Sequence, residues 1–191
     1  MTEKSQHTEH LAPRPTGLGE GEGSLTTLRV LDILEDTTVD GPGFRTSIYL
    51  AGCQHRCPGC HNPESWDANA GEDVEIDDLM KVIINDPFAH VTLSGGDPLM
   101  QAAACAILCQ RIKAETDKTI WCYTGYTWEA LLAKNDANVM SLLSHLDVLV
   151  DGPFIQSLRD TDLLFRGSSN QRLIDVQKSL SSNEVILWQR E

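Results

Sequence analysis

Three cysteines, Cys53, Cys57 and Cys60, stand close together in the stretch GCQHRCPGCHN with the spacing C-x3-C-x2-C. Thiolates at such close spacing can bind one metal centre together. A closed structural zinc site needs four ligands, which usually come as two pairs. No fourth cysteine follows at a matching distance, so the stretch leaves one coordination position of such a centre without a protein ligand.

The other cysteines and the nearby histidines are weak candidates for that position. Cys105 and Cys109 are spaced i, i+4 among alanines and leucines, which is typical of core residues on an apolar helix. Cys122 lies inside a β-prone run and is expected in the core for the same reason. His55 and His61 are so near the cysteines that chelation of the same ion would be cramped. A zinc-stabilised interaction module is therefore an alternative that the sequence does not favour.

An iron–sulfur cluster is the favoured interpretation of the cysteine loop. A 4Fe–4S cube has one iron at each corner, so three cysteines leave the fourth iron open. An open position is what a catalytic metal centre requires, whereas a cluster that only carries electrons is capped by four cysteines. Pro58 and Gly59 keep the loop tight, and Gly59 allows the backbone to approach a ligand closely. The open position then predicts a substrate site.

The segments around this loop alternate between strand-like and helix-like patterns. Apolar, β-prone runs predict strands at residues 28–34, 46–52, 90–94, 119–124, 147–154 and 184–188. Helical spacing, acidic first turns, an N-terminal proline and an N-cap at Thr127 predict helices at residues 75–86, 98–115 and 127–134, with one or two more turns at 140–146.

Strands that alternate with helices indicate an α/β fold with a mostly parallel sheet. The chain is shorter than a full eight-fold barrel, which leaves an open or partial β/α barrel or a doubly wound sheet. In either fold, function gathers at the carboxyl ends of the strands. The cysteine loop, Gly95–Asp97, Thr124–Tyr126 and Asp151–Gly152 each follow a predicted strand, so we expect them at one edge of the sheet.

Charge and composition limit the function classes further. The chain has 191 residues and a net charge of −13, and so acidic a protein repels phosphate backbones, which argues against a nucleic-acid partner. No apolar run approaches the roughly 20 residues that span a bilayer, and no secretory signal is evident, so we expect a cytoplasmic protein without a membrane partner. Residues 1–24 are rich in Gly, Pro, Glu, Ser and Thr, which predicts a disordered tail with His7 and His10 solvated.

Several motifs resemble those of one enzyme family. The cysteine spacing after a strand resembles the signature of the radical S-adenosylmethionine enzymes, and DGPGFR before it and CHNPESWD after it resemble activating enzymes of glycyl-radical proteins. Later motifs resemble, in order, the activating proteins of anaerobic (class III) ribonucleoside-triphosphate reductases: LSGGDPL, TGYTWEAL, VLVDGPF and FRGSSNQRLIDV. The resemblance covers about residues 28–176 and implies a radical S-adenosylmethionine domain over residues 25–191, folded as a partial, open β/α barrel.

The resemblance also implies how the cofactors are held. Cys53, Cys57 and Cys60 are the implied ligands of a 4Fe–4S cluster, whose fourth iron is chelated by the amino and carboxylate groups of S-adenosyl-L-methionine. The other implied cofactor-binding residues are Gly59 and His61 near the adenine, Gly95, Gly96 and Asp97 at the methionine ammonium, and Asp151 near the ligand. Glycines permit close backbone approach, and carbonyls with a carboxylate suit an ammonium. By chemistry alone, His61 could equally be a solvated loop residue and Asp151 a turn-forming one.

The string RGSSNQ, which begins with Arg166, Gly167, Ser168, Ser169 and Asn170, bears on the partner. An arginine beside hydroxyls and an amide can grip a carboxylate or a partner backbone. An ordinary surface turn would have a similar composition. Within the resemblance, the string is typical of reductase activators and not of pyruvate formate-lyase activators, so it implies the anaerobic reductase as the protein substrate.

The implied chemistry is radical generation. A one-electron donor such as flavodoxin or ferredoxin reduces the cluster, which passes the electron to the sulfonium of S-adenosylmethionine. The C–S bond breaks to give methionine and a 5′-deoxyadenosyl radical, which abstracts a hydrogen from a glycine of the reductase. The cofactor carries this chemistry and the protein orients it, so no Ser/His/Asp set is needed. The alternatives are an activator of another glycyl-radical enzyme (pyruvate formate-lyase type), a deazapurine synthase, and the zinc-stabilised module.

Overall fold

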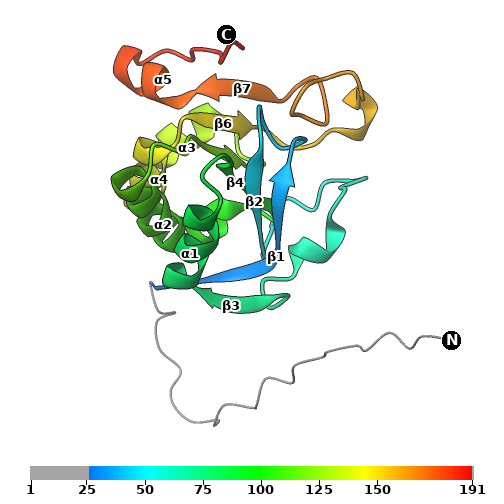
Figure 1. The fold of residues 1–191 in the computed structure, drawn as a ribbon. Helices are drawn as coiled ribbons and strands as arrows, with labels where there is room; N and C mark the ends of the chain where they lie inside the picture. The colour runs from blue at the N-terminus through cyan, green and yellow to red at the C-terminus, as the bar shows by residue number, and fades with distance from the viewer. Residues whose placement is uncertain (1–25, 191) are drawn as a thin grey trace, which may run out of the picture.

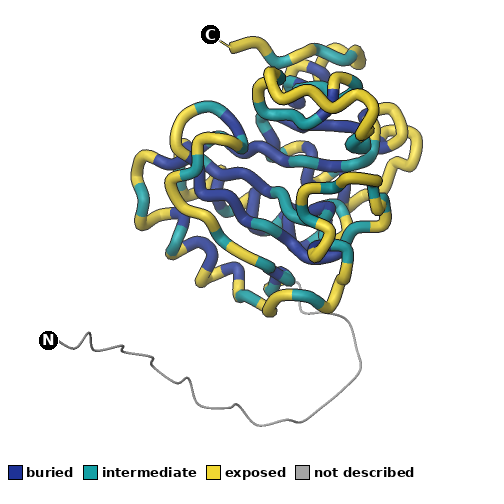
Figure 2. The backbone as a smooth tube through the Cα atoms, turned by 90° about the vertical axis from the view of Figure 1, so that its right-hand side faces the viewer, coloured by how far each residue is buried: buried dark blue, intermediate teal, exposed yellow. Residues whose placement is uncertain are grey.

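One seven-stranded sheet forms the centre of the protein (Figure 1). The computed structural model describes residues 26–190, so the predicted tail at residues 1–24, with His7 and His10, lies outside the described residues. The strands are β1 Thr27–Thr37, β2 Arg45–Leu50, β3 Glu72–Glu75, β4 His90–Gly95, β5 Ile120–Tyr123, β6 Val148–Asp151 and β7 Arg172–Asp175. The residues of β2, β4, β5 and β6 are mostly buried, and Figure 2 shows the buried segments in dark blue at the centre of the molecule.

The order of the strands across the sheet is β3-β1-β2-β4-β5-β6-β7. β2, β4, β5 and β6 are parallel neighbours, whereas β1, β3 and β7 pair antiparallel at the flanks. Among the described strands, β3 and β7 are the two ends of the order and do not pair with each other, so the sheet is open. The predicted α/β class with a mostly parallel central sheet is confirmed, and the loops after the four parallel strands leave the sheet at one edge.

Helices α1 to α4 lie together on one side of the sheet (Figure 1). The described helices are α1 Ile76–Asn85, α2 Ala102–Glu115, α3 Trp128–Lys134, α4 Ala137–His145 and α5 Val176–Ser182. The first three predicted helices are confirmed, although residues 98–101 form a tighter 3-10 turn before α2. Thr127 is the N-cap of α3, because its side chain accepts a hydrogen bond from the amide of Ala130. The predicted turns at residues 140–146 belong to α4, which starts earlier because Asp136 caps it.

The cysteines outside the loop are core residues, as the sequence predicts. Cys105 and Cys109 on α2 and Cys122 on β5 are all 0% exposed and belong to the main apolar cluster between the sheet and the helices. Burial raises the pKa of each of these three thiols. They are therefore protonated and inaccessible, and they are poor metal ligands in this fold.

The prediction of a strand at residues 184–188 is wrong. This apolar segment runs beside β7 but forms only a single antiparallel bridge, between Leu187 and Ile174. Its residues are at most half-buried, and Leu187 is 54% exposed. Trp188 packs edge-to-face against Trp121 with ring centroids 5.0 Å apart. The apolar run therefore reflects partial packing beside β7 and not a ladder.

Two short flanking strands and one helix were not expected from the sequence. β3 has the sequence EDVE, whose acidic side chains carry no strand signal, and it pairs only with β1. β7 lies within the motif FRGSSNQRLIDV, and α5 begins at the last residue of that motif, Val176. Both strands sit at the flanks of the sheet, where pairing on one side suffices and apolar patterning is weak.

A buried arginine joins the DGPG segment to the amino ends of the parallel strands. Arg45, the first residue of β2, is 0% exposed and donates hydrogen bonds to the hydroxyl of Thr92 (2.6 Å) and to the carbonyls of Val91 and Thr119. Its guanidinium also lies over the ring of Trp121, 5.3 Å from the centroid. Burial lowers the pKa of Arg45 to about 10, so the side chain stays charged at neutral pH. A Cβ at Gly41 would lie 2.7 Å from this side chain, which explains the glycine there.

No helix among residues 26–190 combines the length and the apolar composition that crossing a bilayer requires.

We expect Arg45→Met to lower the free energy of unfolding by about 3 kcal/mol, because several buried acceptors lose their donor at once. Urea denaturation followed by circular dichroism measures this. Arg111→Met is the matched control. Arg111 makes ion pairs on the surface, where solvent screens them, so the urea midpoint of this variant should stay close to that of the wild type. Equal midpoints for the two variants would contradict a structural role for Arg45.

Candidate functional site

The cysteine loop begins at the carboxyl end of β2 and closes on itself. The amides of Gly52 and Cys53 donate hydrogen bonds to the carbonyls of Ser65 (2.8 Å) and Trp66 (3.3 Å), which lie in the 3-10 turn Pro63–Trp66. The loop therefore returns to its starting point over the motif CHNPESW. Figure 1 shows it on the side of the sheet away from α1 to α4.

Cys53, Cys57 and Cys60 are partly exposed, and none of them forms a disulfide in the structure. The amide of Cys60 donates to the carbonyl of Cys57 (3.1 Å), so the two residues are joined by a tight turn in which Gly59 has φ +75°. Only glycine adopts that conformation without strain. Burial raises the pKa of the Cys53 thiol, and the backbone amides of His55 and Arg56 oppose this shift. Among residues 26–190, no group of three His, Cys, Asp or Glu side chains lies close enough together to hold one metal ion.

The Gly95–Asp97 element lies directly against the start of the cysteine loop. The amides of Gly96 and Asp97 donate hydrogen bonds to the carbonyls of Leu50 (2.7 Å) and Gly52 (2.8 Å). Gly95 has φ +95°, and a Cβ there would lie 2.4 Å from the backbone nitrogen of Leu50. A Cβ at Gly96 would lie 2.3 Å from the carbonyl oxygen of Gly52. Both glycines are thus required by the close approach of two backbones.

The carboxylate of Asp97 is 1% exposed and is surrounded by hydrogen-bond donors. It accepts from the amide of Leu99 (3.0 Å), from the amide of Gly125 (3.1 Å) and from the hydroxyl of Thr124 (3.0 Å to Oδ2). The Nε2 atom of His55 lies 3.0 Å from Asp97 Oδ2. Asp97 therefore connects the ends of β4 and β5 to the cysteine loop.

Residues after β6 cover the other side of the cysteine loop. The ring of His61, an exposed residue, lies edge-to-face with Phe154 at a centroid distance of 5.9 Å. A Cβ at Gly59 would lie 3.0 Å from the side chain of Gln156. Gly59 and His61 are thus close to the segment that follows VLVDG, which brings two distant motifs together.

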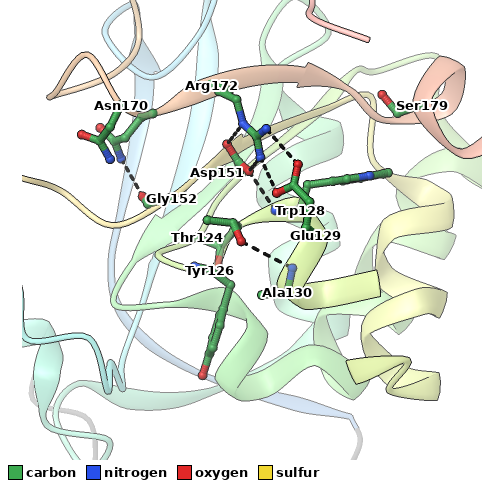
Figure 3. Close-up of polar contacts among 12 residues, drawn as sticks. Thr124, Tyr126, Trp128, Glu129, Ala130, Asp151, Gly152, Asn170, Arg172 and Ser179 are labelled. Carbon is green, nitrogen blue, oxygen red and sulfur yellow. Dashed lines mark hydrogen bonds and ion pairs between the residues drawn. The ribbon is translucent and has the colours of Figure 1, made fainter. Parts of the chain in front are cut away.

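Asp151 is part of a separate ion-pair network, which Figure 3 shows. The carboxylate is 1% exposed, accepts from the amide of Trp128 (2.8 Å) and forms an ion pair with Arg172. Arg172 also donates two hydrogen bonds of 2.9 Å to Glu129. Hydrogen bonding to both acids raises the pKa of Arg172. The network ties β6 and β7 to the first turn of α3, and the contacts of Asp151 in it are structural.

The RGSSNQ loop is folded against the residues that follow β6. Gln171 accepts from the amide of Gly167 (2.9 Å) and donates to the carbonyl of Gly152 (3.1 Å). Asn170 donates to the carbonyl of Pro153 (2.8 Å), and the Nη1 atom of Arg166 donates to the carbonyl of Gln171 (2.8 Å). Buried Ser168 and its neighbour Ser169 are held by backbone contacts to residues 158–159. The loop forms the outer wall of the segment that contacts the cysteine loop.

Sequence reasoning missed the contributions of several residues at this site. It considered His55 only as a cramped zinc ligand, and it assigned no role to Arg172 or Glu129. Thr124 and Gly125 stood out as residues after a strand, but their shared contact with Asp97 was not expected. The usable signal for His55 was its position between two cysteines.

A family model described as a 4Fe-4S single cluster domain matches residues 39–174, which span the cysteine loop, the Gly95–Asp97 element and the RGSSNQ loop. The chain thus belongs to an iron–sulfur class of protein.

Proteins with similar sequences identify the family within this iron–sulfur class. The anaerobic ribonucleoside-triphosphate reductase-activating proteins of Salmonella typhi and Escherichia coli K12 are each 43% identical to this chain, with 70% of this chain and 89% of the relative covered. The protein of that name from Enterobacteria phage T4 is 34% identical, with 71% of this chain and 86% of the relative covered. The chain belongs to the family of anaerobic ribonucleoside-triphosphate reductase-activating proteins, which are radical S-adenosylmethionine activating enzymes. The resemblance seen in the sequence is confirmed at the level of the family.

We expect Asp151→Ala to lower the free energy of unfolding by about 2–3 kcal/mol, because it leaves Arg172 and the Trp128 amide without their buried acceptor. Thermal or urea denaturation measures the loss. Glu129→Gln is the matched control: Glu129 is an exposed partner of the same arginine, so only a small fraction of that loss is expected. If both variants lost the same stability, the buried ion pair would not be the anchor of β7.

Proposed function

We propose that this chain activates an anaerobic ribonucleoside-triphosphate reductase by reductive cleavage of S-adenosyl-L-methionine at a 4Fe–4S cluster. The observation that carries the proposal is the loop with three accessible thiols, joined by backbone hydrogen bonds to the Gly95–Asp97 element. The names of the relatives support the identity of the protein substrate. The open sheet supports, for this domain, the partial β/α barrel that the family resemblance implies.

The donor set fits such a cluster. Cys53, Cys57 and Cys60 are soft thiolate ligands on one loop, and the three remaining cysteines of the chain are buried in the apolar core. Three ligands for four irons leave one iron for the substrate. The hydrogen bond from the Cys60 amide to the Cys57 carbonyl holds two of the three cysteines on one tight turn.

Two groups of residues are proposed to hold S-adenosylmethionine. Gly95, Gly96 and Asp97 are proposed to receive the methionine ammonium through their backbone, whose position is already fixed by the contact with Gly52 and Leu50. The Asp97 carboxylate is buried and already bonded to four neighbours, so it holds this element in place. Gly59 and His61 lie on the other side of the loop, where the His61 ring can pack near the adenine. Asp151 is proposed to act near the ligand through the position of Gly152 and Pro153, since its own carboxylate is paired with Arg172.

The chemistry supplied by the bound cofactors is one-electron cleavage of S-adenosylmethionine to methionine and a 5′-deoxyadenosyl radical that takes a hydrogen atom from a glycine of the reductase. The residues of the chain bind and orient the substrate and exclude water from the strand ends. A flavodoxin- or ferredoxin-type protein is the proposed source of the electron. We further propose that the reductase docks beside the RGSSNQ loop, where Ile155 and Leu158 are 38% and 41% exposed next to the cysteine loop.

The first test is Cys57→Ala, reconstituted with iron and sulfide without oxygen. We expect loss of most of the bound iron and sulfide and of S-adenosylmethionine cleavage, because one iron loses its ligand. Cys109→Ala is the matched control: it removes a buried core thiol, so stability should fall by about 1 kcal/mol while iron content and cleavage persist. Unimpaired cleavage by Cys57→Ala would contradict the cluster assignment.

The second test is Leu158→Asp, which places a charge on the proposed docking surface. We expect glycyl-radical formation, read as an electron-spin signal on the purified reductase, to fall about tenfold at limiting reductase. The loss should shrink as reductase concentration rises, because a surface contact affects binding. Leu132→Asp is the control, since Leu132 is similarly exposed at 37% but lies on α3. Equal effects of the two substitutions would place the reductase elsewhere.

A further inference from the structure

The side chain of His55 is inserted between the ends of two parallel strands. His55 lies on the loop between Cys53 and Cys57, and its ring reaches Asp97 after β4 and Gly125 and Tyr126 after β5. Its Nε2 atom is 3.0 Å from Asp97 Oδ2, and its ring lies edge-to-face with Tyr126 at a centroid distance of 4.4 Å. The imidazole side chain is 18% exposed.

Gly125 provides the room for this ring. A Cβ at Gly125 would lie 2.3 Å from the Cδ2 atom of His55, a distance at which the ring must move. The backbone of Gly125 has no positive φ, so the glycine is required by the approach of the imidazole and not by the conformation of the chain. The imidazole of His55 therefore fills a space between Asp97, Gly125 and Tyr126, which we call the socket.

The orientation of the Asp97 carboxylate is fixed by donors other than His55. Its carboxylate is oriented by Leu99, Thr124 and Gly125, and the fourth donor is His55. Asp97 Oδ2 already accepts hydrogen bonds from Thr124 and Gly125, so the hydrogen-bond network assigns His55 Nε2 as a further donor to it. A hydrogen bond to a buried carboxyl group is costly to break, because it leaves a polar group unpaired.

We propose that His55 is a positioning residue that fixes the cysteine loop, and with it the open iron, against the Gly95–Asp97 element. This inference rests on the proposed function. S-adenosylmethionine must reach the open iron and the ammonium site at the same time, and the span of the ligand is fixed. If the cysteine loop is already ordered, S-adenosylmethionine binds without having to order it. Loss of the His55 contact therefore lowers the affinity of the protein for S-adenosylmethionine.

The test compares His55→Phe with His55→Gln in the full-length chain, reconstituted without oxygen. Phe keeps a ring for the socket but cannot donate to Asp97, whereas Gln restores a donor at a similar reach. We expect about tenfold weaker S-adenosylmethionine binding by calorimetry for His55→Phe and substantial rescue by His55→Gln. The change that S-adenosylmethionine causes in the electron-spin spectrum of the reduced cluster should weaken in parallel, with iron and sulfide content near that of the wild type.

Gly125→Ala tests the socket without changing the loop. Its Cβ displaces the His55 ring, so it should weaken S-adenosylmethionine binding about as much as His55→Phe does. In a double-mutant cycle, Gly125→Ala should cause little further loss in a His55→Ala background, because the ring that it displaces is already absent. Additive losses would show that Gly125 acts independently of His55.

Three results would overturn the proposal: wild-type affinity in His55→Phe, tighter binding in His55→Phe, or additivity in the cycle. Tighter binding would mean that the imidazole occupies the place of the ligand. Failure of the proposed function is recognised separately, because the reconstituted wild-type protein would then bind no S-adenosylmethionine at all.

Discussion

Two backbone hydrogen bonds, from the amides of Gly96 and Asp97 to the carbonyls of Leu50 and Gly52, hold the loop after β2 against the loop after β4. They continue the parallel pairing of the two strands beyond the last paired residues, Leu50 and Gly95. Everything else at the site is placed relative to this contact, because the cysteine loop starts on one side of it and the Asp97 carboxylate on the other. Side chains larger than hydrogen at Gly95 or Gly96 would force the two backbones apart.

Near this contact, the buried carboxylates of Asp97 and Asp151 hold neighbouring elements in place and are not reactive groups. Asp97 draws together donors from the ends of β4 and β5, and Asp151 does the same for β6, β7 and α3 (Figure 3). A buried carboxylate surrounded by donors is costly to move, since each displaced donor would be left unpaired. The loops at the strand ends are therefore held by polar contacts, whereas the helices are held by apolar packing.

The sequence predicted the central strands and the longer helices because burial imposes a period on them, as in α1 with Ile76, Leu79, Met80 and Ile83. It did not predict β3, whose residues are acidic, and it misread residues 184–188, because apolar content reports burial and not pairing. At the site, the close spacing of the three cysteines is visible in the sequence itself. The contact of His55 with Asp97 could not, because it spans 42 positions and exists only through the neighbour order of β2, β4 and β5.

The division of the six cysteines into two groups has a consequence for damage by oxygen. Cys105, Cys109 and Cys122 are sealed in the core, so oxidants reach them only when the chain opens. The three thiols on the loop are reachable in the native fold. If these three cysteines hold the proposed cluster, air would oxidise its ligands while the core stayed intact. A preparation with native circular dichroism and a native melting temperature would then lack the proposed activity, so folding alone would not measure it.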